Sequence, residues 1–416
     1  MIPAVGLLVL TGLSTPAQAY PGAPWFQPSK PYSENFPDPD VLHVGTDYYA
    51  YGTSTGGAYL PVMRSTDLTT WIARPAYDPG PPLNSDPYFN DALPYPASWG
   101  VDVNTGTRMT KQVWAPGVEH FGSTYVAFYS IRTRISPPRY CISYATASSP
   151  QGPFTDRTAG PLVCDDDPAG SIDPAPFVDP ATGTAYLIWK SEGVVGSAPT
   201  KIWGRQLTTT GTAFEPGSTA HELLRTSQTW EGNVIENPSM IRQNGQLYLF
   251  YSGNEFASAD YATGYATCTS ALGPCTKARS GPLLASTSDR LGPGGASAFL
   301  DNAGGLRLAY HWWNAPYTSY PAYPECQQNG TCTTQGQRRM SVVELSGSGT
   351  GLQVGAATSP SPSPSPSPNA QSTSCVDRTL TVRVNTPVIN ATGLASVTVS
   401  GAAPGQAVVL QGYSQN

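Results

Sequence analysis

The sequence predicts an all-β protein built as a five-bladed β-propeller. Five short aromatic strands recur along the chain: Tyr48–Tyr51, Val126–Tyr129, Tyr186–Trp189, Tyr248–Tyr251 and Arg307–Tyr310. They recur at intervals of roughly 60 to 80 residues, which suits one four-stranded blade with elaborated loops and is too long for a hairpin. Blades of this kind bury their faces against their neighbours around a central axis.

The composition agrees with an all-β fold that has many turns. The chain has 416 residues, and 12% of them are charged, against roughly 25% in an average globular protein. It is rich in Gly and Pro, with 42 of each, and long amphipathic helical patterns are hard to find. A formal net charge of −6 argues against a nucleic-acid partner, which would need a basic face.

A short motif precedes each aromatic strand, on what should be the innermost strand of the blade. The five motifs are Asp38-Pro39, Trp114-Ala115-Pro116, Asp173-Pro174, Glu236-Asn237-Pro238 and Gly295-Ala296-Ser297. Three of the five carry a carboxylate at what we interpret as one repeat position, and Trp114 replaces the acid in the second blade. Acids directed at one axis from three blades predict an active site.

The hydrolysis of a glycosidic bond requires two carboxyl groups, and a third can supply the negative charge that keeps one of them protonated. One carboxylic acid protonates the leaving oxygen, and one carboxylate activates water or attacks carbon. The acid must keep its proton near neutrality, which takes burial or a nearby negative charge. Asp38, Asp173 and Glu236 meet these needs in type and number.

Each acid has a simpler interpretation when it is considered alone. Asp-Pro is a common turn dipeptide, and a single glutamate is most often a solvated surface residue. Their equivalence within the repeat favours a shared site. Asp40 would face the axis only with a different strand orientation. Glu231 is the main rival of Glu236, which we prefer because it lies in the repeat motif next to Pro238.

Three further residues are candidates for substrate binding. An inward indole at Trp114 would offer a stacking platform for a sugar ring, although structural packing is an alternative. His311 follows the fifth aromatic strand and is either a pocket residue or a buried, hydrogen-bonded histidine. Phe36, at the start of the first acid motif, is counted with them. The acidic run at 165–167 is interpreted as a solvated loop rather than a calcium site.

The N-terminal residues resemble a secretory signal peptide. Residues 2–15 are almost wholly apolar, and Ala17-Gln18-Ala19 matches a small-x-small cleavage site. The stretch is too short to span a membrane. We therefore expect residues 1–19 to be removed and the protein to be secreted.

Export permits disulfide bonds, and the cysteines occur in close pairs. We predict the bonds Cys141–Cys164, Cys268–Cys275 and Cys326–Cys332, which leave Cys375 unpaired. A zinc site is the weaker alternative, because none of the four histidines lies within metal-ligand spacing of a cysteine.

The domain organisation follows from a Ser-Pro repeat near the C-terminus. We expect a propeller over residues 20–357 and an extended linker over 358–369. Residues 370–416 contain three strand-like runs, Thr379–Val388, Ala395–Gly401 and Gln406–Tyr413. Three strands are too few to close a sandwich, so this tail resembles part of an immunoglobulin-like β module.

The acid motifs resemble those of glycoside hydrolase family 43, a family of five-bladed propellers. The matching segments are Phe36–Leu42, Val113–Glu119, Ser171–Pro174 and Val234–Met240, within a region from about Tyr32 to Leu345. The resemblance implies an inverting mechanism, with Asp38 as general base and Glu236 as general acid. It also implies that Asp173 tunes the pKa of the acid and orients it.

One position departs from the family pattern. Arabinan-cleaving members often carry a histidine after Gly-Pro-Gly in the last blade, near an axial metal, and this chain has Gly295 there. This argues against an axial calcium site and an endo-arabinanase assignment, so we expect no metal and no other cofactor. The sister families of invertases retain configuration, and their hallmark Asn-Asp-Pro-Asn is not found at Asp38.

The resemblance implies the breakdown of plant cell-wall polysaccharide. We expect a secreted, monomeric, inverting glycosidase that cleaves arabinofuranosyl or xylosyl linkages, with no nucleic-acid or membrane partner. The alternatives are a carbohydrate-binding propeller without catalysis and a secreted propeller that binds other proteins. The three acids argue against both, because binding alone needs no protonated carboxyl group.

Overall fold

The computed structural model describes most of the region predicted to form the propeller. The described residues are 35–55, 58–73, 91–101, 111–133, 138–164, 170–194, 196–320 and 336–355, with the backbone of 381–384 and 397–400. The chain divides into two compact units, Met1–Ser361 and Pro362–Asn416, which are considered separately. Among the described residues, no helix is long and apolar enough to cross a membrane.

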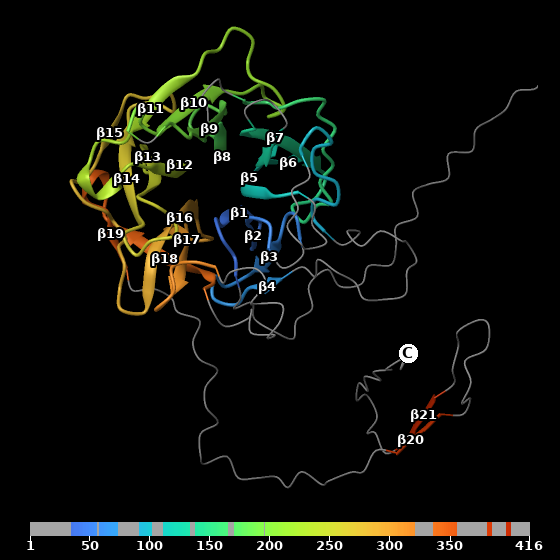
Figure 1. Ribbon diagram of the computed structural model, residues 1–416. Coiled ribbons are helices and arrows are strands. Elements are labelled where there is room, and N and C mark those ends of the chain that lie inside the picture. Colours follow the sequence, from blue (N-terminus) through green and yellow to red (C-terminus); the bar gives the residue numbers. More distant parts are fainter. Residues whose placement is uncertain are drawn as a thin grey trace, which may run out of the picture. The chain divides into compact units, whose positions relative to one another are not determined.

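The first unit is a five-bladed β-propeller, as predicted (Figure 1). Blade 1 consists of β1 (Asp40–Val44), β2 (Asp47–Tyr51), β3 (Val62–Ser65) and β4 (Ile72–Ala73). Blade 2 consists of β5 (Val113–Phe121), β6 (Thr124–Arg132) and β7 (Tyr140–Ala147). Blade 3 consists of β8 (Ser171–Val178), β9 (Ala185–Ser191), β10 (Lys201–Gln206) and β11 (His221–Arg225). Blade 4 consists of β12 (Ile235–Gln243), β13 (Gln246–Gly253), β14 (Ala262–Cys268) and β15 (Cys275–Lys277). Blade 5 consists of β16 (Arg290–Leu300), β17 (Leu306–Asn314), β18 (Arg338–Ser346) and β19 (Gln353–Val354). Two short 3₁₀ helices, η1 (Thr229–Glu231) and η2 (Gly349–Gly351), lie between strands.

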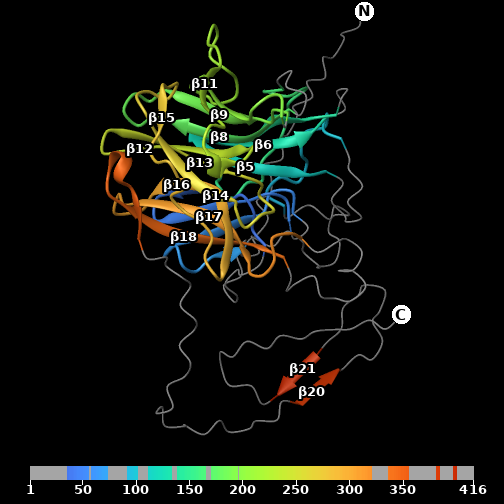
Figure 2. The same cartoon turned by 60° about the vertical axis from the view of Figure 1, so that its left-hand side comes forward.

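Each blade is an antiparallel meander whose first strand is innermost (Figure 1), and Figure 2 shows the same sheets from the side. Short hairpins connect the inner strands, and one of them shows why. Asn244 and Gly245 have φ of 49° and 83° between the paired residues Gln243 and Gln246. Two-residue hairpins favour positive φ at both central positions, and Asn-Gly supplies it at low cost.

The five predicted aromatic strands are the second strands of the blades, namely β2, β6, β9, β13 and β17. They are deeply buried; the four residues Tyr248–Tyr251 of β13 are at most 1% exposed. Their side chains form apolar clusters shared by neighbouring blades: Ile188 of blade 3 packs with Leu249 of blade 4, and Phe250 of blade 4 with Leu308 of blade 5. The repeat period of the sequence therefore reflects one buried strand per blade.

Two of the three predicted disulfide bonds are confirmed. Cys141 in β7 is bonded to Cys164, and Cys268 in β14 is bonded to Cys275 in β15. The predicted Cys326–Cys332 bond and Cys375 lie outside the described residues.

In the second unit, β20 (Thr381–Val384) and β21 (Val397–Ser400) form an antiparallel pair. These strands fall within two of the three runs predicted for the tail. The third run, Gln406–Tyr413, lies outside the described residues, as do the predicted signal peptide at 1–19 and the linker at 358–369.

An acidic side chain on β5 makes the stability of the propeller depend on pH. Burial, with a contribution from the charge of Asp40, raises the pKa of Glu119 from 4.5 to about 7. Burial likewise raises the pKa of Asp40 to about 6, although the Val118 N–H and the Ser297 hydroxyl donate to it. A folded state that holds a proton more tightly than the unfolded state loses stability as pH rises through this range.

We expect Glu119→Gln to stabilise the protein at about pH 8 and to change little at about pH 4.5. The wild type loses stability between pH 4.5 and about 7 as Glu119 ionises, by at most about 3 kcal/mol at about 1.4 kcal/mol per pKa unit. The amide cannot ionise, so the variant avoids this loss. Thermal denaturation of both proteins across this range measures the difference. An effect of Glu119→Gln that is equal at both pH values would contradict the prediction.

Candidate active site

One residue at the innermost strand of each blade lies in the left-handed backbone region, at a bulge in β5, β8, β12 and β16 and just before β1. The five residues occupy the same place in the five blades: Asp38 (φ 51°), Ala115 (φ 39°), Asp173 (φ 55°), Asn237 (φ 48°) and Gly295 (φ 57°). The register of β5, β8, β12 and β16 shifts at this point. Positive φ is uncommon outside glycine and is often found at functional sites.

The bulge corrects one part of the sequence interpretation. Asp38 and Asp173 share the repeat position with Asn237, whereas Glu236 lies one residue earlier. Glu236 pairs with Ser252 across its hairpin in the way that Trp114 pairs with Ser130. Trp114 and Glu236 are therefore equivalent to each other, and the three acids do not occupy one repeat position. The same register shift occurs in β5, β8 and β12, so the strand pairing establishes this equivalence, which periodicity alone did not show.

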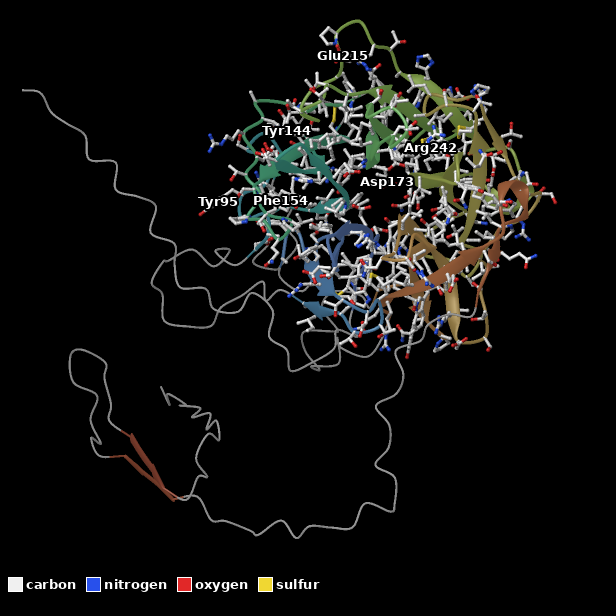
Figure 3. All side chains as sticks on the ribbon, turned by 180° about the vertical axis from the view of Figure 1, so that it is seen from behind. Tyr95, Tyr144, Phe154, Asp173, Glu215 and Arg242 are labelled. Carbon is white, nitrogen blue, oxygen red and sulfur yellow. A yellow bond between two sulfur atoms is a disulfide. The ribbon has the colours of Figure 1, made fainter. Side chains whose placement is uncertain are left out.

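The structure nevertheless directs the acids to the same axis. A narrow cavity of about 20 Å³ is lined by the positive-φ residues of all five blades and by the residues that follow them, including Pro39, Pro174 and Pro238. Figure 3 shows Asp173 near the middle of the ring of blades. Glu236 and Asp173 are joined through the intervening backbone, because the N–H of Asn237 donates to Asp173 Oδ2 at 2.9 Å.

Asp38 accepts hydrogen bonds at both carboxylate oxygens. Arg338 Nη1 lies 2.9 Å from Oδ1, and the Thr53 hydroxyl donates to Oδ2 at 2.5 Å. The Arg338 guanidinium is buried, donates to the Tyr320 hydroxyl at 2.7 Å, and lies over the rings of Phe256 and Tyr320. This arginine fixes the orientation of the carboxylate.

His311 is fully buried beside Asp38. Its Nδ1 accepts the backbone N–H of Asp38 at 3.1 Å, and its ring stacks on Tyr261. Burial, and then the charge of Arg338, lower the pKa of His311 well below its ordinary value, so the ring is neutral and carries its proton on Nε2. That Nε2 has no hydrogen-bond partner among the described residues. The structure thus places His311 against the backbone of the first acid.

Asp173 and Glu236 form the second group of acids. Burial, followed by the charge of Glu236, raises the pKa of Asp173 well above its ordinary value. Glu236 Oε1 accepts the Tyr261 hydroxyl at 2.8 Å, and Oε2 accepts Lys190 Nζ at 2.8 Å. Asp173 therefore retains a proton at a pH where an isolated carboxyl group has lost its own.

The two aromatic candidates lie in different environments. Trp114 is partly exposed, and its ring stacks on Tyr140 with centroids 3.8 Å apart, so one indole face is supported from behind. Phe36 is 1% exposed and belongs to the apolar cluster around Tyr48 and Trp71. This burial argues against substrate contact by Phe36, because a ring without free surface packs the core. The sequence motif showed its proximity to Asp38 but not the direction of its side chain.

Sequence reasoning missed Arg338, Lys190 and Tyr261. Arg338 reaches Asp38 from β18, 300 residues further along the chain, and Tyr261 reaches Glu236 from just before β14; no local pattern marks either residue. Lys190 did carry a signal, since a lysine directly after the buried Trp189 on an aromatic strand needs a charged partner. Its partners are Glu236 and Glu192, at 2.8 and 2.7 Å.

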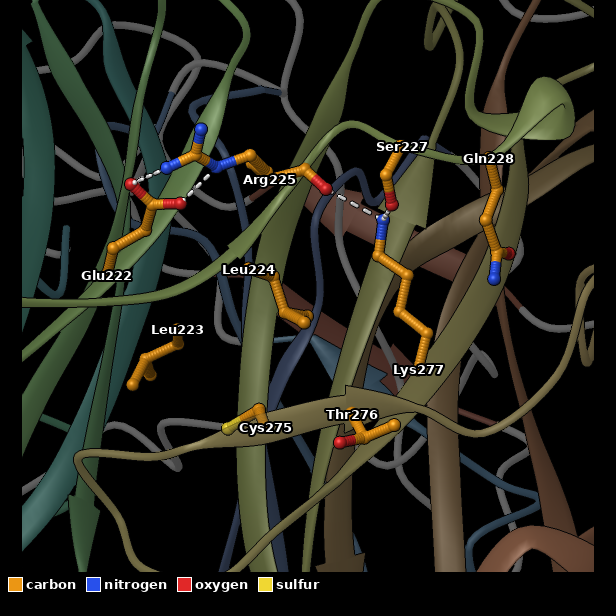
Figure 4. A pocket seen from close by; sticks show the side chains of 9 residues that line it. All are labelled: Glu222, Leu223, Leu224, Arg225, Ser227, Gln228, Cys275, Thr276 and Lys277. Atoms are coloured by element: carbon orange, nitrogen blue, oxygen red, sulfur yellow. Dashed lines mark hydrogen bonds and ion pairs between the residues drawn. The ribbon is translucent and has the colours of Figure 1, made fainter.

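The rival acid Glu231 has a structural environment. It is fully buried, accepts the Tyr251 hydroxyl at 2.8 Å and the backbone N–H groups of Ser227 and Gln228, and pairs with Lys277 at 2.5 Å. Lys277 also donates to the Ser227 hydroxyl and to the Arg225 carbonyl at the wall of a hollow of about 390 Å³ (Figure 4). That hollow lies between the outer strands β11 and β15, and no axial residue lines it.

Replacing Glu231 should therefore affect folding rather than chemistry. We expect Glu231→Gln to lower the free energy of unfolding by about 3–5 kcal/mol, because it leaves the Lys277 ammonium without its charge partner. Urea denaturation measures this loss. The double variant Glu231→Gln/Lys277→Met should recover part of it. A variant as stable as the wild type, but inactive, would instead make Glu231 a catalytic candidate.

The axial residues do not fit a calcium ion. Calcium takes six to eight oxygen ligands, whereas Asp38 is held by Arg338 and Gly295 has no side chain. A Cβ atom at Gly295 would lie 2.5 Å from Nδ1 and Cε1 of His311, so the imidazole occupies that space. Within the described residues, no group of three or more His, Cys, Asp or Glu side chains is arranged to hold a metal.

A five-bladed propeller with carboxyl groups from three blades on its axis defines a class of glycoside hydrolases, and the sequence comparisons agree. The family model of the glycosyl hydrolases family 43 matches residues 29–350. The chain therefore belongs to this family and is a glycoside hydrolase.

Two curated relatives are extracellular endo-α-(1→5)-L-arabinanases. That of Bacillus subtilis is 23% identical over 296 residues, covering 68% of this chain and 82% of the relative. That of Thermotoga petrophila is 29% identical over 119 residues, covering 28% of this chain and only 22% of the relative. Among solved structures, a thermostable family-43 glycoside hydrolase is 26% identical, with a TM-score of 0.60 over 83% of this chain and all of that one.

Proposed function

We propose that the protein is a secreted, inverting glycosidase that cleaves arabinofuranosyl or xylosyl linkages of plant cell-wall polysaccharides. The observation that carries the proposal is the pair of unlike acid environments on one axis. Asp38 is held from both sides by hydrogen-bond donors, whereas Asp173 is buried with a raised pKa next to Glu236. Carboxyl groups that lie in different environments within one site typically take different roles, one as general base and another as general acid.

In this mechanism, Asp38 takes a proton from the attacking water. Glu236 gives a proton to the leaving oxygen on the opposite side of the sugar. Asp173 keeps a proton available to the pair, because its burial and the charge of Glu236 resist the loss of a proton. Trp114, supported from behind by Tyr140, offers an indole face to a sugar ring.

Arabinofuranosyl linkages are the first substrates to test, because both curated relatives are named arabinanases. Secretion is proposed from the apolar segment and cleavage motif at 1–19, and the two relatives are named as extracellular. We further propose that catalysis belongs to residues 20–357, that 358–369 form a linker, and that 370–416 form an accessory module.

The stereochemistry of the first product tests the mechanism. Proton NMR of the sugar released during the first minutes should show the anomeric configuration opposite to that of the substrate. Inversion is expected because Asp38 activates a water and forms no bond to the sugar. Nitrophenyl arabinofuranoside and nitrophenyl xyloside, followed by arabinan and arabinoxylan, provide the substrates. Retention of configuration would reject the proposed roles of the acids.

A further inference from the structure

One repeated side-chain position links each blade to the next. Each residue at this position is two residues after the second-strand residue that pairs with the second residue past the positive-φ position. The five residues are Thr53, Ser130, Lys190, Ser252 and His311. In four blades, this side chain accepts the N–H of the positive-φ residue of the following blade. The bonds are Ala115 N to Thr53 Oγ1 (2.8 Å), Asp173 N to Ser130 Oγ (3.1 Å), Gly295 N to Ser252 Oγ (2.9 Å) and Asp38 N to His311 Nδ1 (3.1 Å).

Lys190 is the exception, because an ammonium group has three donors and no acceptor. The following blade still presents the corresponding N–H, that of Asn237. It donates instead to Asp173 Oδ2 at 2.9 Å. Lysine at this position therefore transfers a structural hydrogen bond to one of the three acids, and this bond holds Asp173 against the backbone next to Glu236.

The ammonium of Lys190 is itself used by acids. It lies 2.8 Å from Glu236 Oε2 and 2.7 Å from Glu192 Oε2, and its side chain is 3% exposed. Burying a cation is costly unless it is paired. A serine would supply the structural hydrogen bond without that cost, as Ser130 and Ser252 do in the neighbouring blades. The lysine is thus explained by the acids it contacts and not by the joining of the blades.

We propose that Lys190 is a positioning residue for proton donation to the leaving group, a role that rests on the proposed function of Glu236. Lys190 fixes Glu236 Oε2 while the Tyr261 hydroxyl fixes Oε1, so the carboxyl group keeps one orientation. Because Lys190 cannot accept the Asn237 N–H, that N–H donates to Asp173 and holds it beside Glu236. The effect of Lys190 should therefore appear only where the leaving oxygen needs a proton.

Two substrates of different leaving-group acidity test this role. We expect Lys190→Ser to lower kcat about 100-fold or more on an arabino- or xylo-oligosaccharide, whose sugar alkoxide must be protonated. On the matching nitrophenyl glycoside, whose leaving group departs without a proton, the loss should be less than about tenfold. Lys190→Arg, which keeps the charge and the donors, should recover part of the oligosaccharide activity.

The matched control is Thr200→Val. The Thr200 hydroxyl accepts the N–H of Ile235 at 2.6 Å, so it joins blade 3 to the residue before Glu236 without touching an acid. This variant should change kcat on both substrates by the same small factor. Equal losses on both substrates with Lys190→Ser, or no loss at all, would overturn the proposal.

Two further measurements keep the test decisive. Lys190→Met, which has a similar length and no charge, is assayed beside Lys190→Ser after folding is checked by circular dichroism. Unfolding of both variants would identify a structural residue and overturn the proposal. Glu236→Gln separates the two hypotheses: if it shows the substrate-selective loss and Lys190→Ser does not, only the role of Lys190 fails. If Glu236→Gln has no effect, the proposed function fails first.

Discussion

Glu236→Gln should lower kcat on arabinan or arabinoxylan by a factor of about 100 to 10,000, which is the usual contribution of a positioned acid. The amide has the size and shape of the acid and can still accept from Tyr261 or Lys190, so the fold should be preserved. It has no acidic proton to give to the leaving oxygen. Steady-state kinetics on the polysaccharide, with thermal denaturation as a check on folding, measure the effect.

The same variant should lose far less activity on a nitrophenyl glycoside, because nitrophenolate leaves without protonation. Glu231→Gln is the matched control: it changes a fully buried glutamate five residues before Glu236, and its folded fraction should keep a near-normal kcat. An active Glu236→Gln together with a stable, inactive Glu231→Gln would move the acid role to Glu231.

Asp38→Asn should lower kcat by a similar or larger factor, and to the same extent on both substrates. Whatever the leaving group, water must still be deprotonated as it attacks, and an amide oxygen is too weak a base to do so. The isosteric amide keeps the backbone N–H that donates to His311, and its oxygen can still accept from Arg338 or Thr53. Rates on the nitrophenyl glycoside and on the polysaccharide should therefore fall in parallel.

Asp40→Asn provides the control for the base. Asp40 lies two residues from Asp38 and accepts the Val118 N–H and the Ser297 hydroxyl at 2.7 and 3.0 Å. Because Asp40 serves these contacts between blades, the folded Asp40→Asn variant should keep a near-normal kcat. Loss of turnover with Asp40→Asn and normal turnover with Asp38→Asn would assign the base to Asp40.

The sequence alone determined the architecture of the first unit. Blade number followed from the aromatic strands, because each blade needs one strand buried on both faces, and burial selects large apolar residues wherever it recurs. The disulfide bonds Cys141–Cys164 and Cys268–Cys275 followed from short separations, which local strand pairing brings together. The motifs around Asp38, Asp173 and Glu236 pointed to the axis, since each acid is followed within two residues by a proline, which leaves a local pattern.

Only the tertiary structure decided how the acids are held. The bulge beside Asn237 showed that Glu236 lies one residue from the position of Asp38, because strand register depends on hydrogen bonding between strands. Arg338 reaches Asp38 from blade 5, and Lys190 reaches Glu236 from blade 3. Such contacts join residues that are far apart in the sequence. They depend on how neighbouring blades pack around the ring, and the local sequence does not name the partner of each side chain.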